Sequence, residues 1–167
     1  HRGSNINDIS NWINVFNKIN KIASDYNVNI VNLGGGFGTS LTQDDFIKLD
    51  DYLSKVKNEL QIWVEPGRYI VSEAGILLSK VNLVRSKGST NFIGLDTGMN
   101  SLIRPTLYDA YHNIHNISKI DNKNVIKYDI VGPICESGDI LGLNRLLPKT
   151  NINDIILIED AGAYGYT

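Results

Sequence analysis

Residues 34–38, with the sequence GGGFG, form the densest glycine cluster in the chain and follow an apolar run. Successive glycines let backbone N–H groups approach an anion closely, so this loop could bind a phosphate group. The dinucleotide-binding pattern of spaced glycines does not fit, because Thr39 occupies the position of its third glycine. A tight turn without a ligand is an equally good interpretation of these residues taken alone.

Residues 65–68, with the sequence EPGR, place a carboxylate and a guanidinium where a second apolar run ends. Pro66 fixes the turn and pushes Glu65 toward an extended conformation. Taken by itself, this motif is more simply interpreted as a surface ion pair between Glu65 and Arg68.

The only cysteine, Cys135, precedes Glu136 in the sequence CESGD at residues 135–139. A lone cysteine is usually a small buried hydrophobic residue, but two nearby carboxylates and a glycine are an unusual setting for packing alone. No second cysteine or suitably spaced histidine accompanies it, so we expect no metal site. A single cysteine allows no intrachain disulfide, which favours a reducing compartment, the cytoplasm.

Other polar groups could bind a ligand or could be ordinary surface. They include RPTLY at residues 104–108 and DAGAYG at residues 160–165, where one tyrosine stands among small residues. His112 and His115 lie three positions apart and are each followed by an asparagine. We interpret both histidines as solvated side chains rather than as metal ligands.

The spacing of apolar residues predicts alternating helices and strands in the first seventy residues. The expected elements are helices over 9–22 and 46–60 and strands over 27–33 and 62–64. Thr42 and Asp45 have the spacing of a capping box at the start of the second helix, with Asp replacing the usual Glu. A strand–helix–strand sequence within about 35 residues predicts parallel strands joined by a right-handed crossover.

From about residue 75 the pattern changes to short β-like runs separated by turn-prone residues. We expect strands over 75–83, 91–95, 125–131 and 155–158, a turn at 86–89, and a short helix within 108–117. This half is predicted to be a mainly antiparallel β domain. We place the domain boundary so that residues 1–74 and 75–167 belong to separate domains.

His1, Gly34 and Glu65 are 33 and 31 residues apart, close to the length of one βα unit. In a (β/α)₈ barrel the residues that follow the strands gather on one face, where the chemistry takes place. Three units cannot close such a barrel. The spacing therefore predicts that this chain begins in the middle of a domain.

Composition excludes some partners. The formal charge is −2 at pH 7 without a basic run, so nucleic acid and anionic membrane surfaces are not expected to bind. No apolar stretch reaches the roughly 18 residues that a membrane helix needs.

Taken in order along the chain, the motifs HxGS, GGGFG, EPGR, RPxxY, CESGD and DAGAYG resemble the fold-type III pyridoxal-phosphate decarboxylases. The glutamate after the cysteine favours the branch that acts on diaminopimelate. The resemblance runs from His1 to Thr167 and implies an alanine-racemase-like (β/α)₈ barrel, of which only the last units are present, followed by a β domain. It implies decarboxylation of meso-2,6-diaminopimelate to L-lysine and CO₂, with pyridoxal 5'-phosphate as the cofactor.

The resemblance also assigns roles to residues around the cofactor. His1 would stack on the pyridine ring, Ser4 and the glycine loop would hold the phosphate, and Glu65 would face the pyridine nitrogen. The implied cofactor-binding residues are His1, Ser4, Gly34, Gly35, Gly36, Glu65, Pro66, Gly67, Arg68 and Tyr164. An anion at the pyridine nitrogen keeps that nitrogen protonated, so that the ring can accept electrons.

The same resemblance implies a substrate site. Cys135 would donate the proton that replaces CO₂, and Glu136 would recognise the distal amino group of the substrate. The other implied substrate-binding residues are Arg68, Arg104, Tyr108 and Tyr164, of which the arginines suit carboxylates. The site is expected to be shared across a homodimer, in which Cys135 and Glu136 serve the neighbouring barrel.

The family's cofactor lysine lies upstream of the matched region, and Lys48, Lys55 and Lys57 do not match its motif. We therefore expect these residues alone to lack decarboxylase activity. Two alternatives stay open: a sister decarboxylase for another basic amino acid, and a non-catalytic homologue that binds partners. Retention of Glu136, Arg104 and Tyr108 argues against the first alternative. Retention of Cys135, Arg68 and Arg104 argues against the second.

Overall fold

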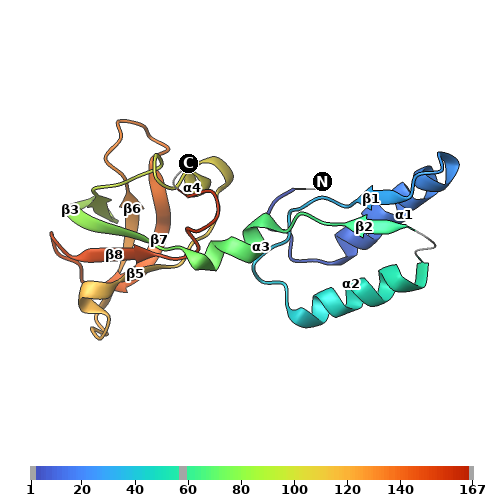
Figure 1. Ribbon diagram of the computed structural model, residues 1–167. Helices are drawn as coiled ribbons and strands as arrows, with labels where there is room; N and C mark the ends of the chain where they lie inside the picture. The colour runs from blue at the N-terminus through green and yellow to red at the C-terminus, as the bar shows by residue number, and fades with distance from the viewer. Residues whose placement is uncertain (1–2, 57–59, 166–167) are drawn as a thin grey trace. The chain divides into compact units, whose positions relative to one another are not determined.

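The computed structural model describes residues 3–56 and 60–165. The chain divides into two compact units, residues 1–71 and 72–167 (Figure 1).

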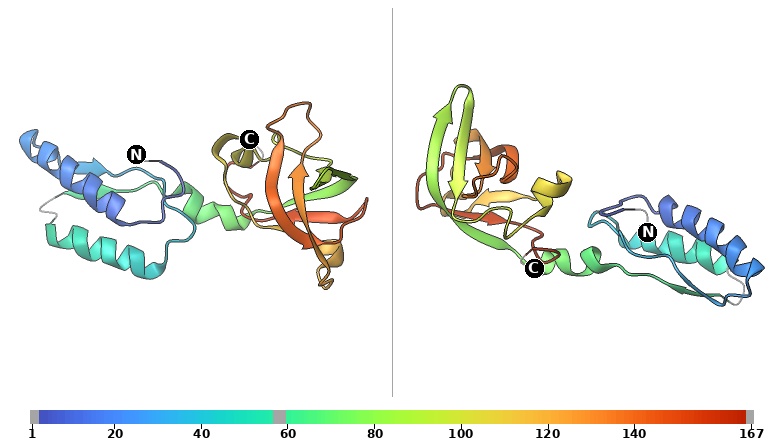
Figure 2. Two further views of the ribbon diagram at one scale, coloured as in Figure 1. Left: turned by 180° about the vertical axis from the view of Figure 1, so that it is seen from behind. Right: turned by 90° about the horizontal axis from the view of Figure 1, so that it is seen from above.

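The first unit contains a pair of short parallel strands and two long helices (Figure 2). Its elements are α1 (Ser10–Asp25), β1 (Ile30–Asn32), α2 (Gln43–Val56), β2 (Gln61–Trp63) and the short α3 (Gly67–Val71). The register pairs Ile30 with Gln61 and Asn32 with Trp63, which confirms the expected parallel pairing.

Both long helices pack on the same face of this strand pair. Phe16 of α1, Val31 of β1 and Leu49 of α2 belong to one buried apolar cluster. Residues on either side of Val31 point to the opposite face, because side chains alternate along a strand. There Ile30 is 43% exposed and Trp63 of β2 is 55% exposed, so this second face is uncovered within the unit.

The capping box before α2 forms as predicted. The Asp45 carboxylate accepts hydrogen bonds from the backbone N–H of Thr42 at 2.9 Å and from its hydroxyl at 2.8 Å. In return, the Thr42 hydroxyl oxygen accepts from the backbone N–H of Asp45 at 3.3 Å. The two side chains thereby bond the backbone N–H groups of both residues, which fixes where the helix begins.

The second unit is a six-stranded, nearly closed sheet in the order β5-β8-β3-β4-β6-β7 (Figure 1). Its elements are η1 (Ser72–Ala74), β3 (Leu77–Lys87), β4 (Thr90–Leu95), α4 (Arg104–Tyr108), β5 (Ile114–Asn116), η2 (Ile117–Lys119), β6 (Val125–Val131), β7 (Ile140–Pro148) and β8 (Ile155–Ile158). The terminal strands β5 and β7 contact each other. The sheet encloses a core that includes Val81, Ile93, Ile130, Leu141 and Ile156.

The sheet is mixed rather than uniformly antiparallel. All described pairings are antiparallel except that of β4 with β6, which pairs Asn91 with Tyr128 and Gly94 with Val131 in parallel. Parallel neighbours need a long crossover. The segment between these strands provides it, since it contains α4, β5 and η2.

One local expectation about this unit is wrong, and one strand was not predicted. The helix expected within residues 108–117 instead spans Arg104–Tyr108, where Asp109 adopts a left-handed conformation (φ 51°) and ends it. Strand β7 was not predicted from the sequence. Its register against β6 is irregular, and Asn144 within it has φ 54°. A bulge of this kind breaks the alternation of apolar and polar residues from which strands are predicted.

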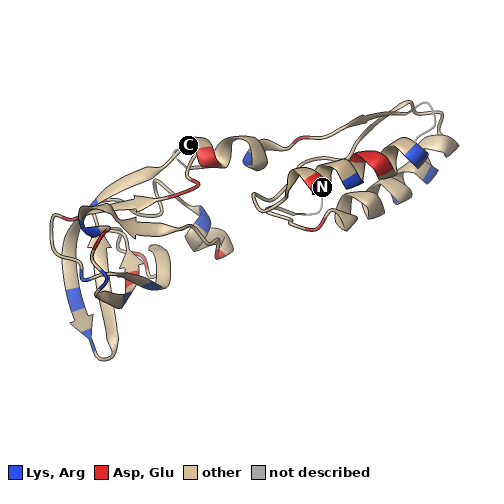
Figure 3. Ribbon diagram, turned by 90° about the horizontal axis from the view of Figure 1, so that it is seen from below, with Lys and Arg blue, Asp and Glu red and all other residues tan. Residues whose placement is uncertain are grey.

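Lysine and arginine residues are interspersed with aspartate and glutamate along both units (Figure 3). Among the described residues, no helix is both long and apolar enough to cross a membrane.

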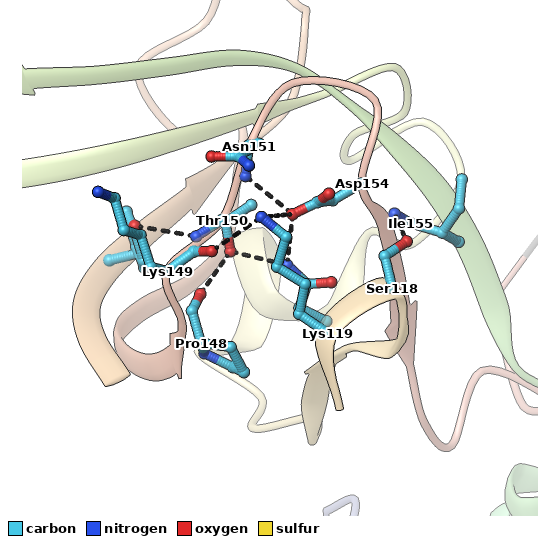
Figure 4. Close-up of polar contacts among 10 residues, drawn as sticks. Ser118, Lys119, Pro148, Lys149, Thr150, Asn151, Asp154 and Ile155 are labelled. Carbon is cyan, nitrogen blue, oxygen red and sulfur yellow. Dashed lines mark hydrogen bonds and ion pairs between the residues drawn. The ribbon is translucent and has the colours of Figure 1, made fainter. Parts of the chain in front are cut away.

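A buried polar cluster ties the β7–β8 connection to the η2 segment (Figure 4). The Asp154 carboxylate accepts hydrogen bonds from the Asn151 backbone N–H at 2.8 Å and from the Asn116 amide at 2.9 Å. Lys119 lies 3.3 Å from the same oxygen. Burial raises the pKa of Asp154, but these hydrogen bonds and the lysine outweigh it, so its pKa lies below its ordinary value.

We predict that Asp154→Asn destabilises the second unit at neutral pH by about 1.5–3 kcal/mol, the range for hydrogen bonds to a charged group. The folded pKa is lowered, so this stabilisation is present above the unfolded pKa and disappears as pH falls through the folded pKa. Unfolding of the full-length protein and its variant should therefore differ at pH 7 and converge at acid pH. Exposed Asp121→Asn serves as the control, and a constant difference at every pH would contradict the prediction.

Candidate functional site

Two of the motifs lie at the carboxyl ends of adjacent parallel strands, as their spacing predicts. The glycine loop follows β1 and the EPGR segment follows β2. The backbone N–H of Glu65 donates to the carbonyl of Gly34 at 3.0 Å, so the two segments are joined directly after the strands.

The segment that follows His1 joins them. The backbone N–H of Ile6 donates to the carbonyl of Gly36 at 2.8 Å, and Gly38 donates to the carbonyl of Ile6 at 2.9 Å. Ile6 and Phe37 thereby form a parallel bridge. Three motifs that are distant in sequence meet at one edge; His1 itself lies outside the described residues.

The glycines at this edge are required by how closely the backbones approach. A Cβ atom on Gly35 would fall within 3.0 Å of the Glu65 carbonyl oxygen, and one on Gly36 would fall equally close to that of Gly3. Gly36 also has φ +92°, which favours glycine. Among the described residues, no group accepts a hydrogen bond from the N–H of Gly35 or Gly36. Two unused donors at a strand end suit an anion such as a phosphate.

Asn32, at the end of β1, orients Glu65 on the next strand. Its side-chain oxygen accepts from the backbone N–H of Gly34 at 2.8 Å, and its NH₂ group donates to the Glu65 carboxylate at 2.6 Å. The carboxylate is thus fixed beside the glycine loop. Asn32 was not predicted from the sequence, although alternation along the strand places it on the uncovered face.

Arg68 and Ser4 also come together. Arg68 lies in α3 and is buried (8% exposed), and its Nη2 donates to the Ser4 hydroxyl oxygen over a long 3.5 Å. Ser4 itself is exposed. The described members of the HxGS, GGGFG and EPGR motifs therefore form one cluster in the first unit.

The CESGD segment is a loop between β6 and β7, so Cys135 lies beyond the strand rather than in it. Cys135 and Glu136 are exposed, and the Glu136 carboxylate accepts from the backbone N–H of Gly138 at 3.2 Å. The loop runs beside α4, where a Cβ on Gly138 would lie 3.2 Å from the methyl group of Thr106.

Asp139 holds this loop in place from within. It is only 3% exposed, and its carboxylate accepts from the backbone N–H of Met99 at 2.6 Å and of Ile134 at 2.8 Å. Cβ atoms on Gly98 or Gly132 would fall within 3.0 Å of that carboxylate. Both glycines leave the space that the buried carboxylate fills. Asp139 is a second residue whose role sequence reasoning missed.

Arg104 is buried in α4, whereas Tyr108 at the end of the helix is 67% exposed. The expectation of a solvated His112 is wrong, because its side chain is 1% exposed and lies 3.2 Å from Nη1 of Arg104. His115 is exposed and pairs with Glu159 at 2.9 Å. The alternation of buried and exposed residues along β5 begins at His112, so one histidine points inward and the other outward.

The DAGAYG loop follows β8 and packs backbone against backbone. Ala161 donates to the carbonyl of Gly75 and Gly162 donates to that of Ser72, each at 2.9 Å. Tyr164 is 59% exposed and adopts a left-handed conformation (φ 56°). Bulky residues seldom occur there, and such strain of about 1–3 kcal/mol clusters at functional loops.

Two family models match the chain and together span almost all of it. Residues 1–72 match the pyridoxal binding domain of the pyridoxal-dependent decarboxylases. Residues 68–162, more than half of the chain, match their C-terminal sheet domain. The chain belongs to the pyridoxal-dependent decarboxylase family. Both the resemblance drawn from the motifs and the expected cofactor, pyridoxal phosphate, are confirmed.

Relatives within this family carry a specific name. The diaminopimelate decarboxylase of Archaeoglobus fulgidus is 38% identical over 99% of this chain, and that of Helicobacter pylori is 36% identical over 99%. The crystal structure of diaminopimelate decarboxylase from Methanocaldococcus jannaschii in complex with L-lysine matches 99% of the chain with a TM-score of 0.83 and 32% identity. This chain spans only 42–43% of the length of these three proteins.

We predict that Gly35→Ala displaces the Glu65 backbone, because the added methyl group would overlap the Glu65 carbonyl oxygen. Overpacking of this kind costs about 1–3 kcal/mol. In the full-length protein the variant should bind pyridoxal phosphate more weakly, as measured by titration. Gly88→Ala is the control, because a Cβ there meets no atom within 4 Å. Unchanged cofactor affinity in Gly35→Ala would contradict the prediction.

We also predict that Asp139→Asn loosens the CESGD loop. An amide keeps one accepting oxygen but turns an NH₂ group toward the other backbone donor, and an unpaired buried donor costs about 1–3 kcal/mol. Hydrogen exchange at Ile134 and Met99 should accelerate, whereas Asp109→Asn, at an exposed position, should leave it unchanged. Equal exchange rates in wild type and Asp139→Asn would exclude this role.

Proposed function

We propose that the full-length protein containing this chain is a diaminopimelate decarboxylase, which converts meso-2,6-diaminopimelate to L-lysine and CO₂. The observation that carries the proposal is the meeting of Ser4, the glycine loop and Glu65 at the carboxyl ends of parallel strands. The names of the relatives supply the substrate.

The architecture we propose is a (β/α)₈ barrel whose last units are residues 1–74, followed by a β domain at residues 75–167. The uncovered face of the strand pair, with Ile30 and Trp63, supports this interpretation. In a barrel that face would line the interior, and neighbouring strands would continue the sheet from its open edges.

The cofactor residues fit pyridoxal phosphate. The N–H groups of Gly35 and Gly36, with the Ser4 hydroxyl, would bind the phosphate, and His1 would stack on the ring. When bound, the cofactor acts as the electron sink for the bond that loses CO₂. Glu65, oriented by Asn32, would accept a hydrogen bond from the pyridine nitrogen and keep it protonated.

The remaining motifs supply substrate contacts and a proton. Arg68, Arg104 and Tyr108 would bind a carboxylate, and Tyr164 would contact substrate and cofactor. The arginines suit the carboxylate that stays, because pairing with the departing one would stabilise the ground state and oppose the loss of CO₂. The Cys135 thiol would then deliver its proton to the carbon from which CO₂ has left.

Glu136 would recognise the ammonium group at the far end of the substrate, where a charged acceptor forms a strong hydrogen bond. Cys135 and Glu136 are both exposed in this chain. We propose that in a homodimer this loop completes the site of the neighbouring barrel.

Substitution of Glu136 tests the substrate. Glu136→Gln keeps the shape but removes the charge, and a charge-assisted hydrogen bond contributes about 1.5–3 kcal/mol. In the full-length enzyme, kcat/KM for meso-diaminopimelate should fall on the order of ten- to hundredfold.

Glu73→Gln, another exposed glutamate of the second unit, is the matched control and should leave kinetics unchanged. Parallel assays with L-lysine, L-ornithine and L-arginine cover the alternative of a sister decarboxylase. Faster turnover of any of these three would reject diaminopimelate as the substrate.

A further inference from the structure

His112 connects two motifs of the second unit through its two ring nitrogens. Nδ1 lies 2.9 Å from the backbone carbonyl oxygen of Glu159, the residue that directly precedes the DAGAYG motif. Nε2 lies 3.2 Å from Nη1 of Arg104, the first residue of RPTLY. The side chain is 1% exposed, so protein groups rather than bulk solvent surround it.

The chemistry of these partners fixes the histidine's protonation. A carbonyl oxygen only accepts hydrogen bonds, so Nδ1 must carry a proton. A guanidinium only donates, so Nε2 must present its lone pair. His112 is therefore the neutral tautomer with hydrogen on Nδ1, as expected when the bond made by one ring nitrogen determines the state of the other.

We propose that His112 is a positioning residue that aims the Arg104 guanidinium at the substrate carboxylate. The proposal rests on the proposed function for the role of Arg104, but the positioning itself does not. One N–H of the guanidinium is held by a rigid ring that is anchored to the backbone after β8. Held in this way, the Arg104 guanidinium keeps one orientation, which a bidentate contact to a carboxylate requires.

The arrangement also makes the position of Arg104 depend on the DAGAYG loop. Glu159 fixes the histidine through its main chain, while its carboxylate binds the outward-facing His115 at 2.9 Å and the Asn113 amide at 2.8 Å. A shift of the backbone before Asp160 would therefore move His112 and with it the guanidinium. The segment that carries Tyr164 and the arginine of α4 are thus mechanically linked.

Two substitutions in the full-length enzyme separate positioning from general packing. His112→Leu keeps an apolar side chain of similar size without an acceptor, whereas His112→Gln restores an oxygen that can accept from Arg104. We expect KM for meso-diaminopimelate to rise about tenfold in His112→Leu, with kcat changed less than about threefold. His112→Gln should recover most of this loss, and Lys123→Gln, at an exposed position away from this network, should resemble wild type.

A double-mutant cycle with Arg104→Lys provides the decisive comparison. If His112 acts through Arg104, the double variant should be no weaker than the more impaired single variant, because contacting residues are not additive. Calorimetric titration with L-lysine, which keeps one substrate carboxylate, should show the same pattern without catalysis. Losses that multiply in the double variant, or an unchanged KM in His112→Leu, would overturn the proposal.

Failure of the proposed function would be visible separately. If the wild-type enzyme does not decarboxylate meso-diaminopimelate, the substrate assignment fails, and crystal structures of the two His112 variants then decide the positioning role. A guanidinium that moves in His112→Leu and returns in His112→Gln would support positioning. A guanidinium that keeps its place in both variants would exclude it.

Discussion

The structure of the first unit depends on one constraint, the close approach of backbones where parallel strands end. The hydrogen bond from Glu65 to Gly34 and the bridge between Ile6 and Phe37 bring three separate segments to one edge. Only a residue without a side chain allows this at Gly35, where Glu65 lies against it. The same feature that lets the loops pack also leaves N–H groups unpaired, so packing and anion binding have a common origin.

In the second unit, buried polar side chains hold the CESGD loop and the segment before the DAGAYG loop in place. A buried polar side chain is costly unless it is hydrogen-bonded. Asp139 and His112 meet this requirement chiefly with main-chain groups, namely the N–H groups of Ile134 and Met99 and the carbonyl of Glu159. Main-chain partners belong to the sheet and its connections. Each loop is therefore tied to the fold itself rather than to another mobile side chain.

The parts of the fold that sequence predicted are those governed by local rules. Helical periodicity located α1 and α2, and the pairing of Thr42 with Asp45 gave the start of α2. Residues whose roles depend on partners far away in the sequence were not predicted. His112 has the sequence surroundings of a surface residue, and its burial arises only because β8 lies alongside β5. Asn32 likewise acquires its role only when β2 brings Glu65 within reach.

Several exposed polar side chains of the second unit contrast with two of its buried ones. Cys135, Glu136 and Tyr164 are exposed, so their side chains are accessible to a ligand or another protein. Asp139 and His112 are enclosed, and they set the geometry of the loops. Exchanging an exposed group alters one contact with the ligand, whereas exchanging a buried one leaves a donor or acceptor unpaired and shifts several contacts together.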